Sequence, residues 1–476
     1  MSSVSYSKLL RGNKNFRRLW TGQVISELGT WFSFIAELGL VRMLSGSAIA
    51  TTGLMLARML PFLIVAPFAG VFVDRRSRKH ILIATDLLRA AIALMYLAAG
   101  RVGSLWFIFA CAALESSLGT FFEAAKNAAL PNLAAKGELL TANVMMLSTR
   151  FLQFTLGAAL GGITAAQFGY DAAFIVNSLS FVLSALCIAP IPASAMRKTY
   201  QERVRARAQA ATTAVGVGDD TKVDFESPAL VPDQAADSIG TLPLAADVRP
   251  VEQKQGAFFS DLREGLHYVW STPFVRGVIL VNIGWAMGGG MNNILYDQMG
   301  GHVFARGEGD RGDWGVAVLF TAVGAGLFIG MMFARRAGAW AADERRAGHF
   351  IGWSLVAHGV CFSLAGFMPT LALMALLLGA SRFIIGMEFG VQETMVMRVT
   401  PDEYRGRVFT TDRALELTMM MISMIVAGWL LTRFSPRTMM IASGMLSATP
   451  GIAWLLAMWL ARFRVPARAV SESYGD

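Results

Sequence analysis

The chain of 476 residues is 54% hydrophobic and only 16% charged, a composition too apolar for a soluble protein of several domains. Its net charge of +9 would suit a nucleic-acid-binding protein, yet the basic residues fall between apolar segments and form neither a stripe nor a known binding motif. The composition therefore predicts an integral membrane protein whose basic residues set its orientation in the bilayer.

Twelve apolar segments are each long enough to cross a bilayer, which takes about 20 residues in a helix. Loops rich in Lys and Arg alternate with short loops poor in both, apart from one that holds Arg433 and Arg437. Because Lys and Arg gather on the cytoplasmic side, an even number of spans places both termini in the cytoplasm. The pattern predicts an all-α protein with spans near residues 19–43, 50–73, 81–100, 104–125, 141–166, 170–191, 275–298, 314–334, 348–368, 370–391, 411–431 and 437–460.

A polar insertion at about residues 193–256 divides the spans into two sets of six. It is rich in Ala, Asp, Gln, Thr and Pro and has too few apolar residues to fold alone. We expect a flexible cytoplasmic linker there, between an N-terminal six-helix half at 1–192 and a C-terminal half at 257–465, with a cytoplasmic tail at 466–476. Apolar residues at helical spacing over 258–270 predict a short interfacial helix, and an ordinary solvated connector is the alternative.

A short basic turn, residues 70–79, joins the second and third spans. It resembles the loop signature of the major facilitator superfamily, G-x-x-x-D-R-x-[GS]-R-[RK], and it lies where that family has it, after the second span. The matching residues are Gly70, Asp74, Arg75, Ser77, Arg78 and Lys79. The resemblance implies the fold of that family, in which two six-helix halves enclose a site at the middle of the membrane and rock about it.

The resemblance also implies a conformational switch. In the family, the acidic residue of this turn meets the inner end of the eleventh helix, where this chain has Arg405 and Arg407. Asp74 would then hold the cytoplasmic side shut in one of two alternating states. Capping of its own loop is the alternative role for Asp74.

Three further stretches resemble one branch of the family, the drug:proton antiporters of type 3. This branch includes macrolide efflux pumps, enterobactin-type siderophore exporters and lysophospholipid transporters. The stretches are residues 15–23 at the first span, 130–143 after the fourth and 401–408 before the eleventh. Residues 157–162 are similar to the antiporter signature G-P-x-x-G-G, but Ala158 replaces its proline, which weakens the implication of antiport.

Ionisable residues inside the spans are costly and are therefore functional candidates. The resemblance places the first, fourth, seventh and tenth helices around the cavity. This selects Glu37, Glu115, Asn292, Asn293 and Arg382. Glu115 lies closest to the middle of its span, where a carboxyl group can be neutral during part of a transport cycle, and it is the candidate proton site.

Two structural alternatives stay open for these residues. Glu115 could instead be hydrogen-bonded to a neighbouring helix, and Glu37 could be the structural partner of Arg58, which lies at similar depth. Asp86 and Arg89 lie one turn apart, which predicts a local ion pair. The glycines at 288–290 weaken the seventh span and predict a bend or opening, with close helix packing as the alternative.

The chain shows no motif of an enzyme. It has no nucleotide-binding loop, zinc-protease motif or nucleophile elbow, and its five histidines are scattered. Cys111, Cys187 and Cys361 lie in apolar runs without C-x-x-C spacing, so we expect neither a metal site nor a cofactor. Transport would then use an ion gradient or run downhill.

Together these features predict a secondary active transporter that exports a bulky, partly apolar, drug-like small molecule across the bacterial inner (plasma) membrane by proton antiport. The bacterial setting is implied by the branch resemblance alone. Its expected partners are the substrate, protons and membrane lipid, with no nucleic acid, and the chain is expected to act as a monomer. A siderophore exporter or lysophospholipid transporter on the same scaffold is the alternative, and a membrane receptor without transport is the alternative of another class.

Overall fold

The structure is a computed structural model that describes residues 6–135, 138–196, 263, 267–305, 312–340 and 344–460. Every regular element within these ranges is a helix. The expected linker beyond Met196, the expected tail at 466–476 and most of the expected interfacial helix at 258–270 lie outside the described residues. What the sequence indicates for these segments stays a prediction.

Several helices before the polar insertion begin and end where the local sequence caps them. The Asn13 side chain accepts a hydrogen bond from the Phe16 backbone N–H at 3.0 Å, and Ser47 caps the next helix in the same way. Gly46 and Gly103 end two helices with φ of +60° and +66°, a conformation that favours glycine. The elements are α1 (Tyr6–Gly12), α2 (Lys14–Ser45), α3 (Ala48–Arg75), α4 (Arg78–Val102), α5 (Leu105–Leu133), α6 (Leu139–Ile188) and the short 3₁₀ turn η1 (Ala193–Met196).

The helix α6 is two membrane spans joined by a sharp turn. Its 50 residues would reach about 75 Å if straight, more than twice the thickness of the hydrocarbon core. Gly169 breaks it, with φ +80° and ψ 173°. The two arms, 139–168 and 170–188, correspond to the fifth and sixth predicted spans, and a glycine at the turn adopts this φ without a steric penalty.

After the insertion, the seventh predicted span is built from three consecutive pieces and the later spans are single helices. The elements are α9 (Pro273–Gly289), α10 (Asn292–Gln298), the π-helical turn η2 (Met299–Val303), α11 (Asp313–Trp340), α12 (Glu344–Gly366), α13 (Leu371–Val399), α14 (Asp402–Leu430) and α15 (Pro436–Trp459). Eleven helices of the described chain are long and apolar enough to cross a membrane. Because α6 crosses twice, the described residues agree with twelve spans and confirm the predicted fold class.

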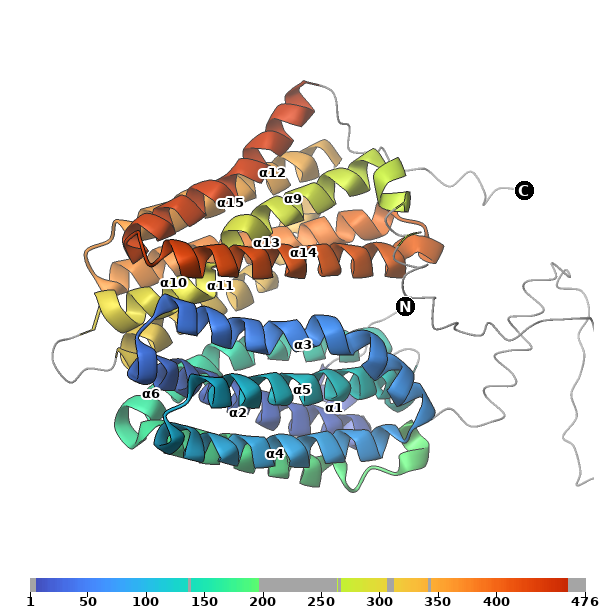
Figure 1. Cartoon of the computed structure of the whole chain (residues 1–476). Helices are drawn as coiled ribbons and strands as arrows, with labels where there is room; N and C mark the ends of the chain where they lie inside the picture. The colour runs from blue at the N-terminus through green and yellow to red at the C-terminus, as the bar shows by residue number, and fades with distance from the viewer. Residues whose placement is uncertain are drawn as a thin grey trace, which may run out of the picture. The chain divides into compact units, whose positions relative to one another are not determined.

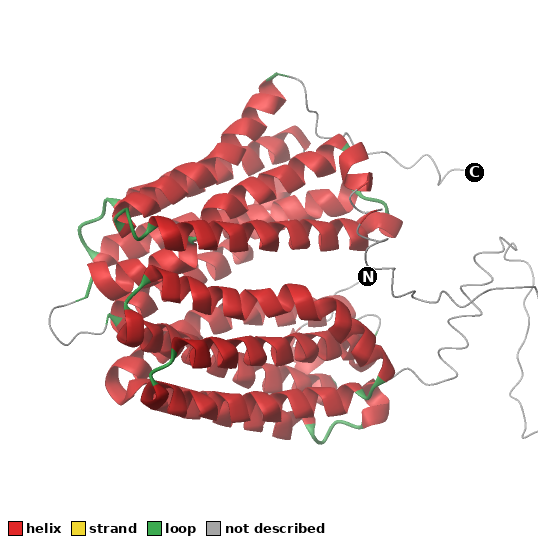
Figure 2. Cartoon of the chain, viewed as in Figure 1, coloured by secondary structure: helices red, strands yellow, loops and turns green. Residues whose placement is uncertain are grey.

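The spans run back and forth between two ends of the bundle (Figures 1 and 2). We call one the terminal end, because α2 begins and α15 ends there, together with the turn between α3 and α4. We call the opposite one the loop end. It holds the turns at 46–47, 103–104, 169, 367–370 and 431–435.

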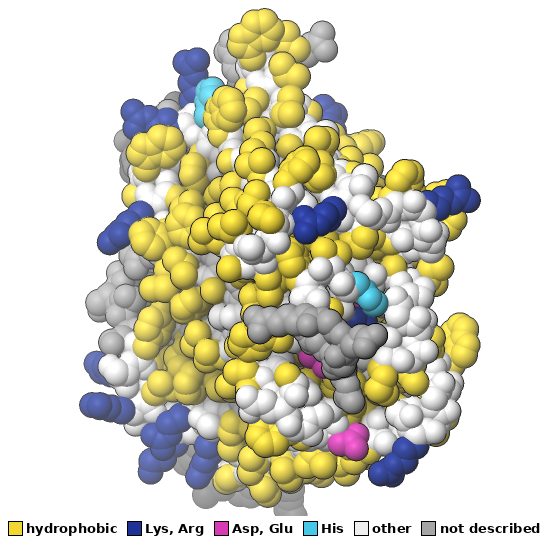
Figure 3. Space-filling view, turned by 90° about the vertical axis from the view of Figure 1, so that its left-hand side faces the viewer, with side chains coloured by type: hydrophobic (Ala, Val, Ile, Leu, Met, Phe, Trp, Pro, Cys, Tyr) yellow, Lys and Arg dark blue, Asp and Glu magenta, His cyan; other side chains and the backbone are white. Residues whose placement is uncertain are grey.

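Large apolar side chains cover much of the outer surface. Phe68, Met332 and Leu376 are between 65% and 69% exposed, as expected only where lipid takes the place of water. These side chains within the spans therefore indicate a protein embedded in a bilayer. Figure 3, which faces the loop end, shows separate Lys and Arg side chains among apolar ones.

Small residues allow close contact between helices on either side of the insertion. In this bundle α6 packs on α11, and α3 packs on α14. A Cβ added to Gly162 on α6 would overlap Ala317 on α11, and one added to Gly428 on α14 would overlap Thr52 on α3. Gly162, Thr52 and Gly428 lie near the loop end, so the helices meet closely there.

The glycines at 288–290 pack closely against neighbouring helices, which is the alternative that the sequence left open, and a gap between two helices follows them. The helix α9 ends at Gly289 and α10 begins only at Asn292, so the span is interrupted. A Cβ at Gly288 would overlap Ser447 of α15, and one at Gly290 would lie 2.5 Å from the Met420 carbonyl oxygen of α14. The interruption and the close packing occur together.

We predict that Gly290→Ala destabilises the protein. Its backbone is helical, so alanine meets no conformational penalty, but the new methyl group meets backbone atoms that cannot rotate away. Overpacking of this kind costs about 1–3 kcal/mol. The melting temperature of the purified protein in detergent should fall by several degrees.

The matched control is Gly338→Ala on α11, where an added Cβ meets nothing within 4 Å. This change should keep or raise the melting temperature, because alanine favours a helix by about 1 kcal/mol over glycine. Equal melting temperatures for the two variants would show that the packing at Gly290 is not tight.

Candidate functional site

A buried ion pair joins α2 to α3. The Glu37 carboxylate on α2 accepts hydrogen bonds from Nη1 of Arg58 on α3 at 2.7 and 2.9 Å. The Ser33 hydroxyl donates a third at 3.2 Å. Glu37 is fully buried, and the Arg58 side chain is 19% exposed. The structure thus brings together two residues that the sequence suggested as a pair.

Glu115 on α5 lies near this pair without bonding to it. It is 2% exposed, and neither carboxylate oxygen has a hydrogen-bond partner among the described residues. Its charge is close enough to act on both Glu37 and Arg58. The suggested hydrogen bond from Glu115 to a neighbouring helix is therefore not formed within the described part of the chain. We call Glu37, Arg58 and Glu115 the carboxyl cluster.

Arg382 on α13 contacts Tyr296 on α10. Its Nη2 and Nε atoms donate hydrogen bonds to the Tyr296 hydroxyl oxygen, at 2.6 and 3.2 Å. Next to it on the helix, the Ser381 hydroxyl lies 2.6 Å from Nδ1 of His358 on α12. All four side chains are buried. A second polar group therefore lies among helices after the insertion.

The two candidate asparagines of α10 differ in their surroundings. Asn292 is buried, and its side-chain oxygen accepts a hydrogen bond from the Ser443 hydroxyl of α15 at 3.1 Å. Asn293 is half-buried and makes no side-chain hydrogen bond with the described residues. Asn292 therefore holds α10 against α15, and the role of either residue in a cavity stays a prediction.

Three aromatic rings, Phe34, Phe320 and Tyr296, connect the two polar groups, and we call them the aromatic bridge. The Cζ atom of Arg58 lies 5.1 Å from the centre of the Phe34 ring. The rings of Phe34 and Phe320 are 5.4 Å apart edge to face, and those of Phe320 and Tyr296 are also 5.4 Å apart. The carboxyl cluster and Arg382 are thus linked by continuous contact across the two sets of helices.

A buried charge network holds the loop end together. Arg42, near the end of α2, forms ion pairs with Asp297 of α10 and Asp313 of α11. The Thr51 hydroxyl donates to Asp297 at 2.8 Å, and the Tyr170 hydroxyl donates to Asp313 at 2.9 Å. All five side chains are buried. We call this network the loop-end latch, because it joins helices from before and after the insertion.

The loop-end latch was not among the contacts predicted from the sequence. A signal for it was present, since Arg42, Asp297 and Asp313 lie at or next to the ends of the first, seventh and eighth predicted spans. In an alternating topology these three ends lie on the same side of the membrane. Opposite charges at equal depth on one side would have suggested the contact.

The basic turn at the terminal end, unlike the loop end, is not closed by a buried charge network in the described residues. Asp74 is exposed and has no hydrogen bond or ion pair with the described residues. Nη1 of Arg78 donates to the Met196 carbonyl oxygen at 2.8 Å, Nε of Arg405 donates to that of Thr400 at 3.0 Å, and Arg407 lies over the Tyr404 ring. The contact of Asp74 with Arg405 or Arg407 is absent from this state.

The remaining residues of this turn lie at the same end. Gly70 has open space where a Cβ would be, Arg75 is exposed and Lys79 is half-buried. The turn is thus accessible in this structure, and its closing onto α14 in another conformation stays a prediction.

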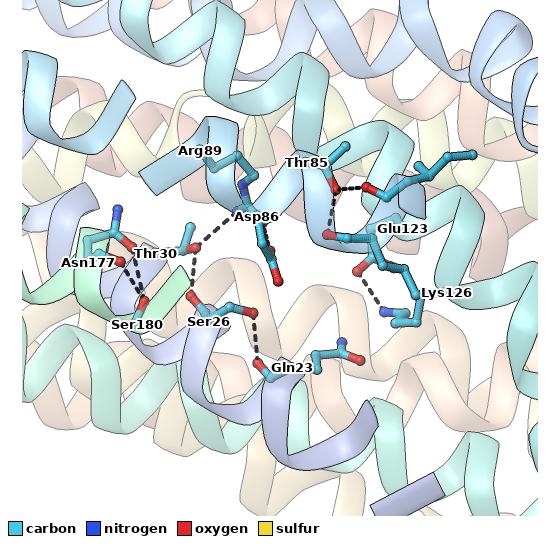
Figure 4. A network of polar contacts seen from close by, with 12 residues as sticks. Gln23, Ser26, Thr30, Thr85, Asp86, Arg89, Glu123, Lys126, Asn177 and Ser180 are labelled. Carbon is cyan, nitrogen blue, oxygen red and sulfur yellow. Dashed lines mark hydrogen bonds and ion pairs between the residues drawn. The ribbon is translucent and has the colours of Figure 1, made fainter. Parts of the chain in front are cut away.

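Two further pairs of charges within the first six spans are local (Figure 4). Nη1 of Arg89 lies 3.8 Å from Asp86, and its Nη2 donates to Thr30 on α2 at 3.2 Å. Nζ of Lys126 lies 2.6 Å from the Glu123 carboxylate. The local ion pair suggested for Asp86 and Arg89 is present, although its contact is long.

Comparison with known proteins shows the family. Residues 19–411 match the family model of the major facilitator superfamily, and the chain belongs to that family. Its fold is also similar to that of the crystal structure of the nucleoside transporter NupG, with a TM-score of 0.62 and 13% identity over 94% of this chain and 99% of that one.

Two curated relatives are transporters. The chain is 30% identical over 202 residues to the uncharacterized MFS-type transporter YfiS of Bacillus subtilis, a match that spans 42% of this chain and about half (48%) of that relative. It is 23% identical over 416 residues to the multidrug efflux pump Tap of Mycolicibacterium fortuitum, covering 84% of this chain and 85% of that one. The protein is therefore a multi-pass membrane transporter with efflux pumps among its relatives, which confirms the resemblance read from the sequence motifs.

We predict that Arg42→Gln opens the loop end. The change leaves Asp297 and Asp313 buried without their cation, which costs about 3–5 kcal/mol. A free-energy difference of about 5.5 kcal/mol moves a two-state equilibrium from 1:99 to 99:1, so much of the population should shift. Spin labels at the exposed positions Val102 and Phe367, one on each side of the insertion, should report longer and broader distances.

The control for this change is Arg101→Gln, which removes an exposed arginine at the same end. It should leave the distance distribution as in the parent. A narrow, unshifted distribution in the folded Arg42→Gln protein would mean that the loop-end latch does not hold this state.

Proposed function

We propose that this protein exports a bulky, partly apolar small molecule across the bacterial plasma membrane by proton antiport, through alternating access. Membership of a transporter family and an efflux-pump relative of nearly full length support export. One observation carries the proton coupling. It is the carboxyl cluster, in which Arg58 pairs with Glu37 while a second buried carboxyl group nearby, that of Glu115, has no hydrogen-bond partner among the described residues.

The charge balance of the carboxyl cluster explains how it handles a proton. With Glu37 bound to Arg58, an ionised Glu115 would be a net negative charge away from water, and such charges are expensive inside a membrane. A proton on the Glu115 carboxyl group removes that charge. A cycle that loads the proton on one side and releases it on the other couples transport to the proton gradient.

The two ends of the bundle support the alternating-access part of the proposal. The loop-end latch is formed while Asp74 at the terminal end is free of the contact expected in the opposite state. Since the basic turn at 70–79 lies at the terminal end, the positive-inside bias assigns that end, and both termini, to the cytoplasm. This state is closed to the outside.

The organisation of the chain follows from the same cycle. Two six-helix halves, 1–192 and 257–465, would move against each other while the linker at 193–256 keeps them together. Each chain contains both halves of a substrate site, so a monomer suffices for transport.

We predict that Glu115→Gln uncouples transport from the proton gradient. Glutamine has the shape of the protonated acid but cannot release a proton. Vesicles containing this variant should exchange an exported drug down its gradient while failing to accumulate it when a pH gradient is imposed. The measurement is uptake of a fluorescent drug that the parent protein transports into inverted vesicles.

A matched control is Glu388→Gln, which makes the same chemical change at another buried carboxyl group, on α13. Pumping by this control should persist. If Glu115→Gln vesicles still accumulate the drug against its gradient, Glu115 is not the proton site, and Glu37 becomes the residue to test.

A further inference from the structure

Arg382 is a buried cation with no acidic partner among the described residues. It is 6% exposed, and the hydrogen bonds of its guanidinium group both go to the Tyr296 hydroxyl, a neutral oxygen. A guanidinium group has five N–H donors, and only those on Nε and Nη2 are used here. No other hydrogen bond of this guanidinium group is formed with the described residues, and no carboxylate among them pairs with it.

Three other arginines within the described spans have acidic partners. Arg42 has two aspartates, Arg58 has Glu37, and Arg89 has Asp86. A buried charge without a partner is costly enough that proteins seldom keep one without a use. The exception at Arg382 therefore indicates that its counter-charge comes from outside the chain.

The surroundings of Arg382 are aromatic. Its Cζ atom lies 5.7 Å from the centre of the Phe362 ring and 6.0 Å from that of Tyr296. Phe320 stands edge to face with Tyr296, and all three rings are less than 2% exposed. One cation set among aromatic rings matches a ligand that carries an anionic group on an aromatic or apolar body.

Tyr296 also connects this place to the loop-end latch. It directly precedes Asp297, the partner of Arg42, on the seven-residue helix α10. That helix is separated from α9 by the break at 290–291 and continues into a π-helical turn, so it is short and irregular at both ends. An anion that takes the Arg382 donors from Tyr296 acts on the same segment that holds the loop end shut.

We propose that Arg382 and Tyr296 form a binding site for an acidic group, a carboxylate or phosphate, on the molecule that this protein transports. This inference rests on the proposed function, because it names the chemical class of the exported compound. A partly aromatic acid would fit the rings of Tyr296 and Phe362 and supply the charge that Arg382 lacks.

Simple aromatic probes test the site without a known substrate. The protein in nanodiscs of neutral phosphatidylcholine is heated with benzoate, phenyl phosphate or neutral benzamide at constant ionic strength. Benzoate and phenyl phosphate should raise the melting temperature by about 2 °C or more at concentrations well above their dissociation constants, and benzamide should not. In Arg382→Gln the difference between acid and amide should vanish.

Two further variants keep the test decisive. Arg382→Lys retains the positive charge and should keep part of the shift, which covers the case in which Arg382→Gln does not fold. Arg433→Gln removes an exposed arginine and should respond like the parent. Equal shifts for benzoate and benzamide in the parent, or a benzoate shift that survives in folded Arg382→Gln, would overturn the proposal.

A lipid headgroup is another source of the same chemistry, and a second set of nanodiscs separates the two. If phosphatidylglycerol alone stabilises the parent protein and abolishes the benzoate shift, the acidic group belongs to lipid and the assignment to the transported molecule is wrong. The binding assay uses no proton gradient, so it tests the anion site independently of the proposed function. If the acids do not bind, the proposal of proton-driven export still stands. If Glu115→Gln does not uncouple transport, the proposal of an anion site still stands.

Discussion

The cost of burying charge away from water governs the arrangement of this bundle. Each ionised side chain inside the spans needs a partner of opposite charge or a proton. The chain meets this requirement at Arg42 with its two aspartates and at Glu37 with Arg58. Glu115, Glu388 and Arg382 are among the buried groups that have no partner of opposite charge in the described residues. The imbalances at Glu115 and Arg382, of opposite sign, lie where a proton and a substrate are expected to act.

A chain of side-chain contacts connects Glu115 and its neighbours to Arg382 and to the loop-end latch. The aromatic bridge runs from Arg58 through Phe34, Phe320 and Tyr296 to Arg382. Directly beside it on α10, Asp297 belongs to the loop-end latch. A change of charge at either imbalance therefore acts on residues that contact the closed end. Coupling of this kind needs only packed side chains with two discrete arrangements.

Much of the fold could be predicted from the sequence. The length of each apolar segment indicates a membrane span, and the uneven distribution of Lys and Arg between the loops indicates how the spans are oriented. The interruption near 288–290 was also predictable, since consecutive glycines weaken a helix locally. The pairing of Glu37 with Arg58 could be suggested from equal depth. The loop-end latch was missed because Arg42 and Asp297 are 255 residues apart, and only the folded bundle shows that their side chains meet. The same holds for the aromatic bridge, whose rings look like ordinary core residues in the sequence.

The most direct test of this account is the protonation state of the carboxyl cluster in the protein at rest. Infrared difference spectroscopy of the protein in nanodiscs at neutral pH resolves the C=O stretch of a protonated, buried carboxyl group. We predict that one component of this absorption disappears in Glu115→Gln and that the same component persists in Glu388→Gln, which removes only the contribution of the separate buried carboxyl group of Glu388. A spectrum in which Glu115→Gln removes only ionised carboxylate absorption would show that Glu115 is charged at rest and would contradict the charge balance proposed here.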